Sequence, residues 1–134
     1  MIQLFYVFSD WGLLALRLAL GAIFLVHGWR KIKDMKGTAE AFQGMGFKPG
    51  KFWATLVALL EFVGGIAFII GLLTQVFAAF LAIEFIVILV KVKKFKQFVG
   101  GYEFDLLILA ALLALCTLGG GSASADSFFG ILLY

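Results

Sequence analysis

The feature that most constrains this fold is an apolar run, residues 52–73, that contains a single carboxylate, Glu61. As a helix the run spans ~33 Å, which is enough to cross the hydrocarbon core of a bilayer. Glu61 then lies near the middle of the membrane, where an ionisable side chain is costly and needs a buried partner. Two interpretations stay open: Glu61 holds helices together, or it belongs to a ligand or proton site.

Three further apolar runs, at about residues 11–29, 76–90 and 102–118, repeat this pattern. The chain is 63% hydrophobic, whereas a soluble domain is roughly half apolar. We therefore expect one all-α domain over residues 1–134, a bundle of four transmembrane helices that run up, down, up and down. The N-terminus has no signal-peptide pattern, so the first helix is expected to act as an uncleaved insertion signal. The single cysteine, Cys116, excludes an internal disulfide.

The basic residues predict the orientation of the bundle. Ten of the eleven Lys and Arg residues lie in two loops that fall on the same side of an up-and-down bundle: Arg30, Lys31, Lys33, Lys36, Lys48, Lys51, Lys91, Lys93, Lys94 and Lys96. By the positive-inside rule these loops are cytoplasmic and both termini lie outside the cell membrane. The net charge of +3 is then explained by contact with anionic lipid headgroups rather than with nucleic acid.

Four more ionisable residues interrupt the apolar runs. Counted at 1.5 Å per residue from the outer face, Arg17 lies ~9 Å deep, Glu84 ~12 Å, Glu61 ~18 Å, and His27 and Glu103 ~24 Å. These residues could form a polar column that binds a ligand or carries protons, or they could form two structural pairs, Arg17 with Glu84 and His27 with Glu103. By this count Glu61 has no cation at its own level and is expected to be a neutral acid. With one histidine, no metal site is expected.

Small residues share a helical face with these charges. Gly64 and Gly65 lie three and four residues after Glu61, and Gly21 and Gly28 lie four and eleven residues after Arg17. Glycines at such positions let two membrane helices approach closely. We therefore predict that these four glycines are helix-packing positions.

Four stretches, in order along the chain, carry a family resemblance: RLALGAIFLVHG (17–28, with Lys31 following), EFVGG to GLLT (61–74), GYEF (101–104) and GGGSASAD (119–126). Together they resemble the DoxX family of small four-helix membrane proteins. The chain departs from the family pattern where Val90-Lys91 replaces a histidine late in the third helix, where Gly120 replaces a proline, and at Glu84, a position not typical of the family.

The resemblance implies a redox context, because relatives include a subunit of a thiosulfate:quinone oxidoreductase and proteins of quinone and catechol stress. The first functional expectation is thus a membrane subunit that binds a quinone or similar molecule among Arg17, His27, Glu61, Glu84 and Glu103, with a soluble or membrane partner that supplies the redox centre. The sequence has no haem, flavin or iron–sulfur motif of its own. A non-enzymatic scaffold that packs against other membrane helices is the second expectation, and a proton-linked transporter, which would need a homo-oligomer, is the third.

Overall fold

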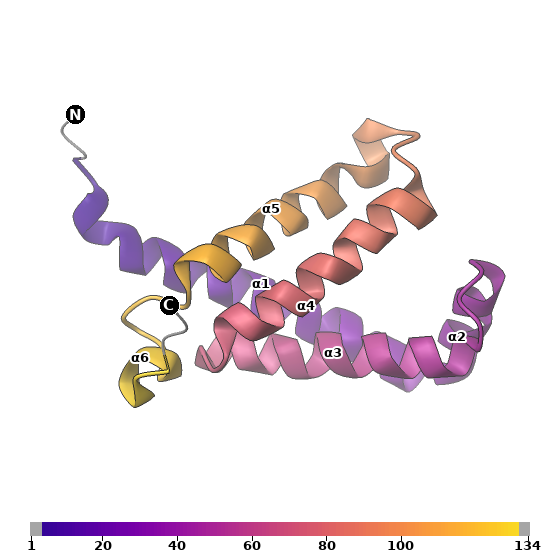
Figure 1. Ribbon diagram of the computed structural model, residues 1–134, viewed down its shortest axis with the longest axis horizontal. Helices are drawn as coiled ribbons and strands as arrows, with labels where there is room; N and C mark the ends of the chain where they lie inside the picture. The colour runs from indigo at the N-terminus through magenta and orange to yellow at the C-terminus, as the bar shows by residue number, and fades with distance from the viewer. Residues whose placement is uncertain (1–3, 132–134) are drawn as a thin grey trace.

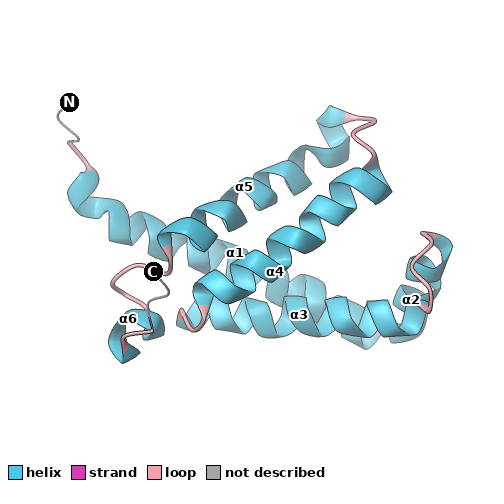
Figure 2. Ribbon diagram, viewed as in Figure 1, coloured by secondary structure: helices cyan, strands magenta, loops and turns pink. Residues whose placement is uncertain are grey.

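The structure is a computed structural model that describes residues 4–131 of the 134-residue chain. Within that part the chain is helical with connecting loops (Figure 2). Four helical stretches are long and apolar enough to cross a membrane: Tyr6–Lys33, Gly50–Ile70, Thr74–Lys93 and Phe98–Leu118. The predicted all-α bundle of four transmembrane helices is therefore confirmed.

The helices follow one another with short connections. After a 3-10 turn (Tyr6–Phe8) come α1 (Ser9–Lys33), α2 (Met35–Gly44), α3 (Gly50–Ile70) and α4 (Thr74–Val87), which continues as a wider π-helical segment, Ile88–Lys93. A kinked turn, Phe98–Tyr102, in which Val99 is extended and Gly100 has φ +70°, leads into α5 (Glu103–Leu118), and the short α6 (Ala125–Phe129) follows.

The bundle consists of two helix pairs that cross. α1 packs along α3, α4 packs along α5, and the α4–α5 hairpin diverges from α3 (Figure 1). The α3–α4 turn and the C-terminal segment lie at one end, here called the terminal end; α2 and residues 88–102 lie at the other, the loop end. Phe24 of α1 joins the pairs, with its ring centre 6.1 Å from that of Phe68 and 5.7 Å from that of Phe85.

Glycines allow the backbones of α1 and α3 to approach closely. A Cβ atom added at Gly21 would lie 2.9 Å from the Gly65 carbonyl oxygen, and one at Gly65 would lie 2.6 Å from the Leu25 nitrogen. Gly28 likewise lies against the backbone of Phe62. Gly64 faces the other way, toward α4, where an added Cβ would lie 3.1 Å from Leu81.

Two boundaries differ from the sequence-based expectation. α1 continues to Lys33, four residues beyond the first apolar run, and α2 begins at Met35, because Asp34 accepts a hydrogen bond from the Gly37 nitrogen and caps the new helix. The α3–α4 turn occupies residues 71–73 rather than residues 74 and 75, which separate the second and third apolar runs. Gly71, with φ +79°, closes α3 in the left-handed conformation that glycine adopts readily.

Candidate functional site

An ion pair lies between α1 and α3 inside the membrane-spanning part of the bundle. The Lys31 ammonium group lies 2.5 Å from Glu61 Oε2. The Glu61 side chain is 3% exposed, and the Lys31 side chain, near the C-terminal end of α1, is 25% exposed. The pair thus supplies the buried partner that a carboxylate needs inside a membrane.

A second carboxylate joins this pair from α4. Glu84 lies close enough to Glu61 and Lys31 to interact electrostatically with both. Its Oε2 atom is buried and has no donor partner among the described residues, and the Glu84 and Glu61 carboxyl groups lie within hydrogen-bonding reach of each other. A buried oxygen without a hydrogen-bond partner destabilises the folded state, typically by about 1–3 kcal/mol. We refer to Lys31, Glu61 and Glu84 as the acid–lysine cluster.

The composition of the acid–lysine cluster leaves hydrogen-bonding capacity free. Two carboxyl groups share one ammonium group, and an ammonium group has three donor hydrogens. One of those donors is directed at Glu61. The cluster can therefore receive a hydroxyl or N–H donor at Glu84 Oε2 and can offer an N–H donor to a ligand acceptor from Lys31.

The expectation that Glu61 has no cation at its own level was wrong. The depth count ended the first span near residue 29, but α1 continues to Lys33. A helical side chain is tilted toward the helix N-terminus, so the Lys31 side chain extends back into the bundle. The signal was present in the sequence, because Lys31 lies three residues after Gly28 and continues the buried face of Arg17, Gly21, Phe24 and Gly28.

Arg17 lies in a different environment, at the terminal end, and does not pair with Glu84. Its guanidinium group donates to three backbone carbonyls: Phe68 at 2.9 Å, Gly120 at 2.8 Å and Ala123 at 2.9 Å. Arg17 is 1% exposed, so these bonds satisfy a fully buried cation. The arrangement ties the C-terminal segment to the end of α3.

Asp126 completes this second cluster. Its carboxylate accepts hydrogen bonds from the backbone nitrogens of Leu73 at 2.6 Å and Thr74 at 2.9 Å, so it caps the N-terminus of α4 from 52 residues away. The Asp126 nitrogen donates in turn to the Gly71 carbonyl at 2.9 Å. We refer to Arg17, Asp126 and the backbone groups that they bind as the terminal knot.

The remaining predicted site residues lie apart from both clusters. His27 is exposed on α1 and Glu103 is exposed at the start of α5, where it accepts a hydrogen bond from the Gly100 nitrogen. The expected pair of His27 with Glu103 is not formed. Of the five residues predicted to share a polar pocket, the structure therefore brings together Glu61 and Glu84.

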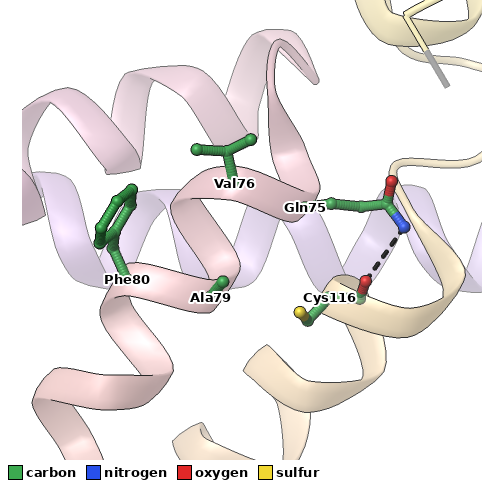
Figure 3. A pocket seen from close by; sticks show the side chains of 5 residues that line it. All are labelled: Gln75, Val76, Ala79, Phe80 and Cys116. Atoms are coloured by element: carbon green, nitrogen blue, oxygen red, sulfur yellow. Dashed lines mark hydrogen bonds between the residues drawn. The ribbon is translucent and has the colours of Figure 1, made fainter. Parts of the chain in front are cut away.

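A surface pocket between α4 and α5 lies outside both clusters. It has a volume of about 350 Å³ and is lined by Gln75, Val76, Ala79, Phe80 and Cys116 (Figure 3). The Gln75 side-chain amide donates to the Cys116 carbonyl at 3.0 Å and links the two helices. Its lining is largely apolar, as expected of a surface that meets lipid.

Comparison with known proteins defines the class of this membrane protein. The DoxX family model matches residues 12–94, which span α1 to the end of the π-helical segment after α4. The chain is 34% identical over 117 residues to "Putative oxidoreductase CatD" of Bacillus subtilis (strain 168), with 87% of this chain and 86% of that protein covered. It is 35% identical over 121 residues to "Inner membrane protein YqjF" of Escherichia coli (strain K12), with 88% and 92% covered.

This chain belongs to the DoxX family and is a membrane protein. No solved structure matches it significantly. Three of the four stretches that carried the resemblance contribute to the two clusters, and the fourth, GYEF (101–104), lies apart. Arg17, the Gly71–Thr74 turn and Asp126 form the terminal knot, and Glu61 lies in the acid–lysine cluster.

Proposed function

We propose that this chain is a membrane subunit that binds a quinol or quinone headgroup at the acid–lysine cluster and serves an oxidoreductase whose electron carrier lies on a partner protein. The observation that carries the proposal is the Glu84 Oε2 atom, buried without a partner beside an intramembrane ion pair. A relative named as an oxidoreductase supports the redox context.

A quinol headgroup matches the free hydrogen-bonding capacity of the cluster. Its hydroxyl hydrogen would be donated to Glu84 Oε2, and an oxygen of the same headgroup would accept from the Lys31 ammonium group. The bond from the ammonium group is charge-assisted and therefore stronger than a neutral one. The hydrophobic tail of the ligand would remain in the surrounding lipid, so the protein needs to recognise only the headgroup.

Binding of a short-chain ubiquinol analogue, kept reduced, to the detergent-purified protein tests this function, because the quinol form carries the hydroxyl that Glu84 would accept. The fluorescence of Trp29 reports binding, because its ring centre is 6.0 Å from that of Phe62, the residue after Glu61, on the α1–α3 pair. Trp11 and Trp53 are replaced by Phe so that Trp29 alone reports. Glu84→Gln should weaken binding by about tenfold or more, because the NH2 group that replaces one carboxyl oxygen cannot accept the headgroup hydroxyl.

Glu103→Gln is the matched control, since Glu103 is an exposed acid of the loop end. It should bind the analogue as the parent does. Equal affinity in the parent and in Glu84→Gln, with both folded, would contradict a headgroup site at Glu84 and leave the scaffold interpretation in its place.

We also propose that the loop end faces the cytoplasm. Both basic loops lie at the same end of the bundle, as the positive-inside rule requires (Figure 1). In a chain with Cys116→Ala, a cysteine introduced at Ser127 should react in intact cells with a thiol reagent that cannot cross the membrane, and one introduced at Lys94 should not. Both positions are exposed. The opposite labelling would reverse the orientation.

A further inference from the structure

A groove on the outer face of α3 lies apart from the acid–lysine cluster. It has a volume of about 570 Å³ and is lined by Pro49, Lys51, Phe52, Thr55, Leu56 and Leu59. Leu59 precedes Glu61 by two residues and therefore points to the other side of the helix. Phe52, Leu56 and Leu59 are each about half exposed, at 57%, 49% and 50%. The groove thus faces the surroundings of the bundle rather than its core.

The groove combines an apolar floor with a cation at one end. Lys51 lies in the first turn of α3 at the loop end, and the exposed Lys48 precedes it on the other side of Pro49. From Lys51 to Leu59 the helix rises ~12 Å. This length is less than half of the ~30 Å hydrocarbon core, so the groove lies within a single leaflet.

We infer that this groove binds an anionic phospholipid of the leaflet at the loop end, with an acyl chain along Phe52, Leu56 and Leu59 and the headgroup phosphate at Lys51. The charge at the mouth selects an anionic headgroup, and the apolar floor on a membrane-spanning helix selects an aliphatic chain. A free phosphate ion would leave the apolar part of the groove unused. A quinone would leave Lys51 without a counter-charge.

Retention of lipid by the full-length protein tests the site. The protein is reconstituted in bilayer discs of equimolar phosphatidylglycerol and phosphatidylethanolamine, extracted with mild detergent, and analysed by mass spectrometry for lipid bound per chain. The parent should retain phosphatidylglycerol in preference to phosphatidylethanolamine. Lys51→Gln should reduce that retention about fivefold, the effect of one lysine near an anionic headgroup. Leu56→Trp, which fills the groove, should abolish it.

Two substitutions of the same chemistry serve as controls: Lys94→Gln in the other basic loop and Leu107→Trp at an exposed position of α5. Both should retain lipid as the parent does, and all variants should keep the parent's melting temperature because the changed side chains face outward. The inference is overturned if Leu56→Trp retains as much phosphatidylglycerol as Leu107→Trp. It is also overturned if both lipids are retained equally, or if excess inorganic phosphate displaces the bound lipid.

Discussion

The terminal knot and the acid–lysine cluster contain the same kinds of side chain but bond them to different partners. In the terminal knot each charge binds backbone groups: Arg17 donates to three carbonyls and Asp126 accepts from two nitrogens. In the acid–lysine cluster the charges face one another, and one carboxylate oxygen has no partner among residues 4–131. The first cluster is closed in its hydrogen bonding and the second is open.

The difference shows which buried charges are structural. Backbone groups at a helix end or turn need partners wherever they are buried, so a charge that binds several of them closes the fold. A carboxyl oxygen without a partner beside an ion pair does not stabilise the fold. Its burial lowers the stability of the folded state, and a bound ligand that donates a hydrogen bond would offset that loss. The proposed ligand recognition therefore involves Glu84, whereas Arg17 closes the fold, although both were predicted to line one pocket.

The largest expected effect comes from the closed cluster. Arg17→Met should lower the free energy of unfolding by about 3–5 kcal/mol, because three carbonyls lose their donor inside the bundle. Thermal unfolding in detergent measures the loss. Arg17→Lys should recover only part of it, since an ammonium group cannot span three acceptors in the planar geometry of a guanidinium.

Arg30→Met is the control, because Arg30 is an exposed cation on the same helix. It should leave the melting temperature near that of the parent. Proteolysis adds a second measure: the segment around Gly120 should become more susceptible in Arg17→Met alone. A parent-like melting temperature and cleavage pattern in Arg17→Met would show that the terminal knot does not hold the tail.

The sequence predicted the spans and helix faces well because both depend on local periodicity. Apolar runs of sufficient length define the four spans, and spacings of three and four place Arg17, Gly21, Phe24 and Gly28 on one buried face. Continuing that spacing by three residues would have found Lys31. The partners of Arg17 and Asp126 could not be found in this way. They are backbone atoms 51 to 106 residues distant, and backbone groups carry no sequence signal.

The α1–α3 contact connects the two clusters, and a smaller effect is expected there. Gly65→Ala should lower the free energy of unfolding by about 1–3 kcal/mol, because the added methyl group meets the Leu25 nitrogen at 2.6 Å and the helices must separate. Since Arg17 and Lys31 lie on the same face of α1, the separation should weaken both clusters. Thermal unfolding and analogue binding should therefore decline together.

Gly12→Ala provides the matched change on α1, where an added Cβ has no neighbour within 4 Å among the described residues. Alanine is the better helix former, so this variant should be as stable as the parent or more stable by about 0.5–1 kcal/mol. If Gly65→Ala behaved as Gly12→Ala does, the close approach of α1 and α3 would not be what positions the two clusters.

The smallest expected effect on stability comes from the acid–lysine cluster. Substitutions there distinguish the roles of its two acids. Glu61→Gln removes the counter-charge of Lys31 and should cost about 1–3 kcal/mol, less than a fully buried pair because the Lys31 side chain is 25% exposed and can turn toward the loop end. Glu84→Gln removes no hydrogen bond at Oε2, since that atom has no donor partner among the described residues. Its unfolding free energy should stay within about 0.5 kcal/mol of the parent. Thermal unfolding of both variants in one detergent makes the comparison, and a Glu84→Gln loss as large as that of Glu61→Gln would make Glu84 a structural residue of the same kind.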